Sequence, residues 1–203
     1  MNSCITCKEA IEHCMSTHTF AFAHLYGDEK IMDMHIHNCC EVYYSISGGK
    51  QFLIDHCLYD IRPGDLFLIN QFESHHLTQI DQQTHERIIL SIDPEYLSKL
   101  STGVTNLGHC FSFRDTRMPH QIHLSPKEQN RFMYFIHELH DDGGMGEDLL
   151  DQAIFLELMV FLNRAFAARC TDAAAPAPAP SSNYHAQVDA ILSYINSHIG
   201  EPL

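Results

Sequence analysis

The chain has 203 residues, of which 45% are hydrophobic and 19% are charged, so it is long and apolar enough for one domain with a substantial core. Its formal net charge is −14, from 26 acidic residues against 12 Lys and Arg. Nucleic acids are bound through clusters of Lys and Arg, so we do not expect this chain to bind DNA by itself. Its eight cysteines fall short of the density of a disulfide scaffold, and free thiols are expected.

The sequence predicts neither a secretion signal nor a membrane span. Residues 1–10 lack a basic region followed by an apolar run. The most apolar stretch, residues 153–162, is interrupted by Glu157 and is about half the length that a bilayer requires. We therefore expect a cytoplasmic protein without a membrane partner.

The first cysteines allow two interpretations. Cys4 and Cys7, with Cys14 and His18 further on, have a spacing at which thiolates and imidazole can share a zinc ion. The same residues also fit a short amphipathic helix with buried thiols. A second Cys-x-x-Cys is absent from this stretch, which favours the helix.

The middle of the chain has the pattern of an antiparallel β protein. Apolar and polar residues alternate in short runs, separated by turn sequences such as Gly48-Gly49 and Arg62-Pro63-Gly64-Asp65. Such spacing is typical of barrels and sandwiches. The predicted strands span residues 19–26, 41–47, 51–56, 58–61, 66–70, 75–80 and 86–92.

Four potential ligands are expected to converge within these strands. His35 and His37 are two residues apart, so both rings would lie on one face of a strand, and Glu41 has the same parity. His75 would return to this group on a later strand, while His76 would face the opposite way. Imidazole and carboxylate suit zinc, nickel, iron or manganese. The alternative is that these side chains line a polar pocket without a metal.

The strand that follows Glu41 has one polar face. Tyr43 and Ser45 share the parity of Glu41, whereas Val42 and Tyr44 lie on the other side. A polar strand face inside a barrel can form hydrogen bonds to a small molecule. We therefore assign Tyr43 and Ser45 to a candidate effector pocket.

Pro94 ends the last strand and begins a short predicted helix, residues 95–100. Two longer helices are predicted after it. Ser125 begins a capping box with Glu128, which predicts a helix to about residue 141. A second helix is predicted over residues 147–169, and its apolar residues are too widely spread to be buried on one side. The extra face could pack against the first helix or against a second subunit. We assign the homodimer interface to Leu149, Ala153, Leu156 and Val160.

The end of the chain has the composition of a linker and one further helix. Residues 173–182 repeat Ala and Pro, which favours an extended semi-rigid spacer. Residues 184–198 carry apolar side chains at the spacing of one helix face.

Two family resemblances follow from these residues. His35-x-His37, Glu41, Gly48, Pro63-Gly64-Asp65 and His75 together resemble the two motifs of the cupin β-barrel. The sequence from Met34 to Leu77 is similar to that of the N-terminal cupin domain of the AraC/XylS family of transcriptional regulators. One departure is that residues 70–73, Asn-Gln-Phe-Glu, stand where enzymatic cupins usually have Pro and Gly.

The resemblance implies a mainly β fold with C-terminal α structure, namely a cupin-type antiparallel β-barrel followed by two dimerisation helices. It divides the chain into an effector-binding barrel (1–124), a helical dimerisation pair (125–170), a linker (171–183) and the first helix of a truncated helix-turn-helix domain (184–203). DNA would then be bound only through that missing domain.

Two functions are compatible with the resemblance. The first is a small-molecule sensor that reports occupancy to an attached DNA-binding domain. The second is a metal-dependent cupin enzyme of the dioxygenase or isomerase type. The linker and the terminal helix favour the regulator, because an enzyme does not need them.

Overall fold

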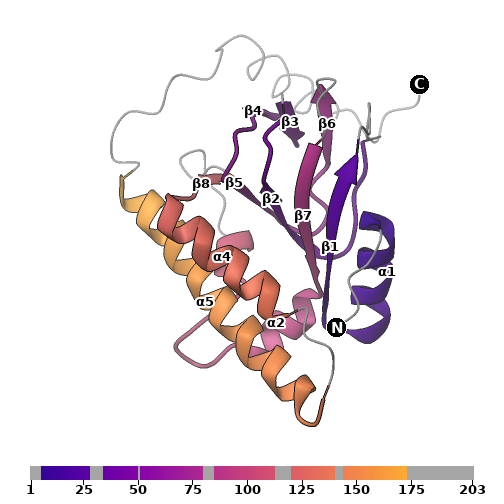
Figure 1. Cartoon of the computed structure of the whole chain (residues 1–203), viewed down its shortest axis with the longest axis vertical. Helices are drawn as coiled ribbons and strands as arrows, with labels where there is room; N and C mark the ends of the chain where they lie inside the picture. The colour runs from indigo at the N-terminus through magenta and orange to yellow at the C-terminus, as the bar shows by residue number, and fades with distance from the viewer. Residues whose placement is uncertain are drawn as a thin grey trace, which may run out of the picture.

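The computed structural model describes residues 6–27, 34–49, 51–79, 85–112, 120–139 and 144–172. They form eight strands and five helices, arranged as two β-sheets with helices on the outside (Figure 1). Within these residues, none of the helices combines the length and the apolar character needed to cross a bilayer. The predicted linker and the helix expected at 184–198 lie outside the described residues.

The larger sheet has five antiparallel strands in the order β1-β7-β2-β5-β8. The strand predicted over residues 19–26 is confirmed as β1, which lies at one edge, and β2 lies at the centre between β5 and β7. The bounds are β1 Phe20–Gly27, β2 Cys40–Ser45, β5 Asp65–Ile69, β7 His85–Ile92 and β8 Gln121–His123.

The smaller sheet has three antiparallel strands in the order β4-β3-β6. Their bounds are β3 Gln51–Ile54, β4 Cys57–Asp60 and β6 His75–Gln79. Phe52 of β3 packs against Tyr43 and Phe67 of the larger sheet, with ring centroids 4.9 and 5.2 Å apart. The two sheets therefore face each other across a shared interior.

Strand alternation divides the larger sheet into an inner and an outer face. Tyr43 and Ile89 belong to the cluster between the sheets, whereas their neighbours Val42 and Leu90 belong to the cluster under the helices. Both faces of β2 are buried along its whole length. The predicted alternation from Glu41 to Ser45 is therefore confirmed, and it places Glu41 on the inner face.

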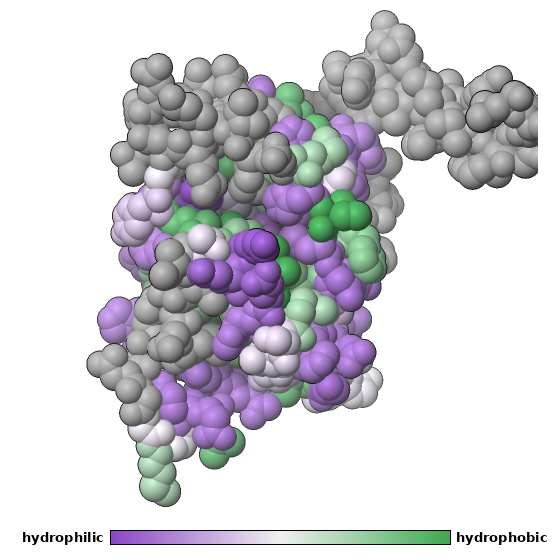
Figure 2. All heavy atoms as spheres, turned by 90° about the vertical axis from the view of Figure 1, so that its right-hand side faces the viewer, coloured by the Kyte–Doolittle hydropathy of each residue, from purple (hydrophilic) through white to green (hydrophobic). Residues whose placement is uncertain are grey.

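The first helix, α1 (Cys7–Thr17), covers the inner face where the small sheet does not reach. Ala10 and Cys14 are fully buried among inner-face residues of β1 and β7, including Ala21 and Ile89. The helical interpretation of this cysteine-rich stretch is confirmed. Figure 2 shows the side of the molecule that carries α1, and hydrophilic residues dominate it.

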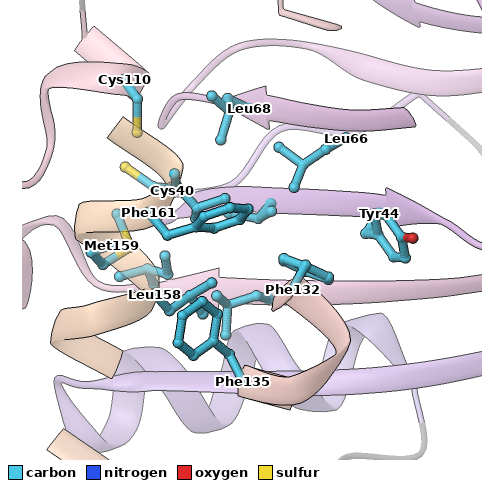
Figure 3. Close-up of a cluster of buried hydrophobic side chains, with 14 of the residues drawn as sticks. Cys40, Tyr44, Leu66, Leu68, Cys110, Phe132, Phe135, Leu158, Met159 and Phe161 are labelled. Atoms are coloured by element: carbon cyan, nitrogen blue, oxygen red, sulfur yellow. The ribbon is translucent and has the colours of Figure 1, made fainter. Parts of the chain in front are cut away.

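The remaining helices cover the outer face. They are α2 (Pro94–Leu100), α3 (His109–Ser112), α4 (Pro126–Glu138) and α5 (Glu147–Asp172). Figure 3 shows Tyr44 and the leucines of β5 facing the aromatic side chains of α4 and α5. The ring of Phe132 lies 4.6 Å from that of Tyr44, and Phe155 stacks on Phe20 at 4.3 Å. The helices thus close the second half of the core.

The sequence-based fold class is confirmed as mainly antiparallel β with C-terminal helices. The Asp93 side chain caps α2, and Ser125 forms the expected capping box with Glu128 of α4. α3 and β8 were not predicted. They have four and three residues, which is too short for a periodic pattern.

The turn before β5 requires a glycine. Gly64 has φ of 85°, and a Cβ there would lie 2.3 Å from the side-chain nitrogen of Gln129. Its N–H donates to the Ser45 carbonyl at 2.8 Å. The turn therefore ties the end of β2 to the start of α4.

An ion pair fixes the end of α5 against the start of α4. Arg169 donates to both carboxylate oxygens of Glu128, at 2.8 and 2.7 Å, and also to the carbonyl of His123 in β8 at 3.0 Å. The hydrogen bond from Arg169 is the main reason why the pKa of Glu128 is lowered to about 2. The last turns of α5 are therefore held on both α4 and β8.

We expect Glu128→Gln to lower the free energy of unfolding by about 1 kcal/mol at pH 7, since it removes the charge from a partly exposed pair but keeps a capping-box residue. Because the folded-state pKa is below the usual value of 4.5, this stabilisation should be lost as pH falls from about 4.5 towards about 2. Denaturant unfolding at several pH values measures it. The control is Glu157→Gln, which breaks an exposed pair with Arg131. Equal effects of the two substitutions at pH 7 would contradict the assignment.

Candidate functional site

His35 is placed by pairing with β6. Its N–H donates to the His75 carbonyl at 3.2 Å, and the His75 N–H donates back to the His35 carbonyl at 3.1 Å. This is an isolated bridge rather than the regular strand on which the sequence argument relied. The convergence of His35 with His37 therefore comes from pairing across the two sheets and not from strand parity alone.

His37 lies between a backbone carbonyl and a buried carboxylate. Its Nδ1 donates to the Cys39 carbonyl at 3.0 Å, and its Nε2 lies 3.1 Å from Oε2 of Glu41. The side chains of His37 and Glu41 are 6% and 1% exposed. The hydrogen bond at Nδ1 fixes the ring so that Nε2 points into the interior.

His75 approaches the same carboxylate from the small sheet. Its side chain is fully buried, and its Nδ1 donates to the Glu73 carbonyl at 2.9 Å. Nε2 lies 3.8 Å from Oε1 of Glu41, and neither of these two atoms has a hydrogen-bond partner among the described residues. Two buried polar atoms thus face each other beyond hydrogen-bonding distance.

The loop that departs from the enzymatic cupin pattern holds both histidines. The N–H of Phe72 donates to the His37 carbonyl at 2.9 Å, while Glu73 supplies the carbonyl that orients His75. The Glu73 carboxylate accepts from the Asn70 N–H at 2.6 Å and so closes the turn. Phe72 has φ of 64°, a strained value for a residue with a bulky side chain. The substituted loop therefore still positions the late histidine.

His37, Glu41 and His75 affect one another's pKa values because they lie close together and are buried. Burial lowers the pKa of His37, but hydrogen bonds to Cys39 and Glu41 outweigh this effect and raise it to about 10. Burial raises the pKa of Glu41, but the hydrogen bond to His37 and the nearby charges of His75, His37 and His35 together outweigh it, so the net pKa is lowered. Burial also lowers the pKa of His75. The contact between His37 and Glu41 thus favours the charged form of both partners, and burial favours the neutral form of His75.

These residues fit a divalent metal ion. One nitrogen from each of His35, His37 and His75 lies within 4.8 Å of the other two. A neutral imidazole and a carboxylate with unused lone pairs are suitable donors, and an ion could replace the His37 proton as the positive partner of Glu41. Three imidazoles and one carboxylate suit zinc, nickel, iron or manganese.

The candidate effector residues lie on the same inner face. Tyr43 is fully buried, and its hydroxyl forms a hydrogen bond with Nε2 of His85. Ser45 is also buried, but its hydroxyl accepts from the Gly48 N–H at 3.0 Å and so serves the hairpin turn. His85 itself is buried on the inner face of β7, at 2% exposure.

Sequence reasoning missed a second polar group next to this site. Nδ1 of His120 lies 2.8 Å from the Tyr59 hydroxyl, and its Nε2 lies 3.3 Å from the Glu73 carboxylate. It also missed Ser91, a fully buried residue directly opposite Glu41 in the β2–β7 register. The alternation of side chains along β7 places Ser91 on the inner face, and this pattern could have identified it from the sequence. His120 follows a stretch without any periodic pattern, so nothing local pointed to it.

Among solved structures, the chain is similar to oxalate decarboxylase from Bacillus subtilis at pH 4.6, with 21% identity and a TM-score of 0.33. The match covers 37% of this chain and 21% of that one, so this chain spans about a fifth of the decarboxylase. It is also similar to an RmlC-like cupin from Shewanella frigidimarina NCIMB 400, with 17% identity, a TM-score of 0.33, and coverage of 37% of this chain and 67% of that one.

No curated protein matches the chain. The AraC-like ligand binding domain model matches residues 19–159, which include β1 to β8, the His35, His37 and His75 group, and most of the helical layer. This match extends over more than half of the sequence. The chain therefore belongs to the family of AraC-like ligand binding domains.

Proposed function

We propose that this chain is the sensing and dimerisation part of an AraC-type transcription regulator. A small-molecule effector would bind on the inner face of the sheets, at His37, Glu41 and His75, either directly or through a metal ion. DNA would be bound by a helix-turn-helix domain that follows the linker. The large excess of acidic residues supports this division, because this part of the protein would be repelled by DNA.

The single observation that carries the proposal is the family match over residues 19–159, which covers the whole polar interior. The described geometry agrees with a binding role. Glu41 Oε1 and His75 Nε2 are buried without hydrogen-bond partners, and a buried polar atom in that state is destabilising unless a ligand or ion satisfies it. The metal-dependent enzyme remains the alternative, and it requires turnover of a substrate at the same histidines.

Native mass spectrometry of the protein as isolated tests the proposal. We expect a retained metal ion or small organic molecule in the wild type, and its loss in His37→Ala and His75→Ala, because each substitution removes a donor from the buried group. Circular dichroism should show that both variants remain folded.

The matched control is His76→Ala. His76 is adjacent to His75 but lies on the opposite face of β6, so this variant should keep the bound species. A wild-type protein that carries nothing and gains no thermal stability from Zn²⁺, Ni²⁺, Fe²⁺ or Mn²⁺ would contradict the metal form of the proposal. Loss of the bound species in all three variants would contradict the assignment to this site.

The surface of α5 supports the dimer. One side of the helix is buried against the outer face through Phe155, Leu158 and Leu162. On the opposite side, Leu149 is 66% exposed and Ala153 is also exposed. The other two predicted interface residues, Leu156 and Val160, are partly buried against the core. An apolar stripe that continues from the core to the surface favours a second copy of α5 as its partner.

We expect Leu149→Glu and Ala153→Glu to convert a homodimer into a folded monomer. Both positions are exposed in the single chain, so the charge is tolerated there, but its desolvation in a helix–helix interface would cost roughly several kcal/mol. Sedimentation velocity at tens of micromolar measures the change. Asn130→Glu, on exposed surface of α4, is the control for adding a negative charge. A wild-type chain that is already monomeric would refute this interface.

A further inference from the structure

One thiol faces the buried carboxylate of the candidate site. Cys7 is the first residue of α1, and its thiol points to Oε2 of Glu41 at 4.0 Å. Thr6 and Glu9 form a capping box that fixes where the helix begins. The position of Cys7 is therefore set by the fold of α1 rather than by a loose chain end.

The packing of α1 directs Cys7 inwards. Ala10 and Cys14 are fully buried in the inner cluster, and Cys7 and Ile11 are partly buried against it. Spacings of three, four and seven residues place these side chains on one helix face. Lys8 and Glu12 are exposed on the other side and form an ion pair there. Cys7 thus lies on the face of α1 that covers the site.

The distances around Glu41 suit donors that share one ion. Ligand atoms bound tetrahedrally at about 2.0–2.3 Å from zinc lie roughly 3.3–3.6 Å from one another. Oε2 of Glu41 lies 3.1 Å from His37 Nε2 and 4.0 Å from Cys7 Sγ, and Oε1 lies 3.8 Å from His75 Nε2. The separation from His37 is shorter, and those from Cys7 and His75 are longer, than one shared ion requires, so these side chains would have to move on binding.

Two buried atoms with unused lone pairs are a second, independent observation that points to a ligand at this site. Glu41 Oε1 and His75 Nε2 are fully buried, and neither has a hydrogen-bond partner in the described part of the chain. A single thiol is not by itself evidence of a binding site. Here it stands beside a carboxylate and an imidazole that each have one buried atom without a hydrogen-bond partner in the described residues, and both kinds of group bind metals.

The other nearby thiols lie in different surroundings. Cys14 donates to the Thr19 carbonyl at 3.6 Å. Cys39 lies 3.3 Å from Nδ1 of His37, which is the nitrogen on the opposite side of the ring from Glu41. Among the described residues, Cys7 is therefore the thiol that contacts the Glu41 carboxylate.

We propose that Cys7 is a ligand of a metal ion held by His37, Glu41 and His75, so that α1 closes the site with a thiolate. This inference rests on the metal form of the proposed function. On binding, the Cys7 S–H and the His37 Nε2–H would each lose a proton to solvent, and the freed sulfur and nitrogen would coordinate the ion, as metal binding to these groups requires. The N-terminal end of a helix favours the thiolate.

A thiolate ligand has two consequences. It makes the site selective for thiophilic ions such as Zn²⁺ or Co²⁺ over Mn²⁺, because soft sulfur donors favour the former. It also occupies a coordination position that a catalytic site keeps open for substrate. Metal binding would then fix α1 on the inner face, which suits a sensor better than an enzyme.

Cobalt titration tests the proposal, because a thiolate bound to Co²⁺ gives near-ultraviolet charge-transfer absorption that imidazole and carboxylate do not give. We expect this band in the metal-free wild type on adding Co²⁺, and its loss in Cys7→Ser and Cys7→Ala. Both variants should still bind Co²⁺ through the histidines, with an affinity lowered by at least the roughly 10–100-fold that loss of an outer-shell partner of a metal ligand costs. The preference for Zn²⁺ over Mn²⁺ should also fall.

The matched control is Cys14→Ser, on the same helix face but hydrogen-bonded to a backbone carbonyl, and it should keep the band. Persistence of the band in both folded Cys7 variants would overturn the proposal. So would a wild type that binds Co²⁺ without the band, or that binds no Co²⁺. If the wild type binds no Co²⁺ but still binds an effector, the Cys7 proposal fails while the proposed sensor function stands. The failure of one is therefore distinguishable from the failure of the other.

Discussion

The buried carboxylate of Glu41 constrains the rest of the structure. Its side chain is 1% exposed at the start of the central strand, and an isolated charge in such a place would be strongly destabilising. His37 compensates it on one oxygen, while the other oxygen faces His75 without a hydrogen bond. Each element that supplies a neighbour must therefore be held in position.

Three separate parts of the chain hold the neighbours of Glu41 in position. The bridge between His35 and His75 joins the segment before β2 to the small sheet. The turn that contains Phe72 binds the His37 carbonyl, and α1 brings Cys7 to the same carboxylate from the edge of the large sheet. The Glu41 group has buried polar atoms without hydrogen-bond partners, and three elements contribute to it. One bound ligand could therefore order all three elements.

The same strand connects the site to the helices. The inner face of β2 carries Glu41, and its outer face carries Tyr44, which packs on Phe132 of α4. The turn at Gly64 and the ion pair of Arg169 then link the end of β2, α4, β8 and the end of α5. A regulator that reads occupancy through its helices would need such continuity between sheet and helices, and double-mutant cycles measure the coupling energies between these groups.

The elements with a clear local pattern were predictable. The alternation around Tyr43 and the capping box of Ser125 are local signals, and both give the observed structure. The candidate site was predicted from the spacing of its histidines, and the side chains do lie together, although His35 reaches them by a bridge between sheets that local spacing does not contain. The approach of Cys7 and of His120 depends on how α1 and β8 pack, which is a non-local property.

The most direct test of the account is a crystal structure of the protein as isolated, with anomalous diffraction data collected to identify any metal. The account predicts density for a metal ion or a ligand polar atom within bonding distance of His37 Nε2, His75 Nε2 and Glu41. Imidazoles that point to different faces, or a Glu41 carboxylate fully satisfied by protein groups alone, would contradict the claim that this buried group is a binding site.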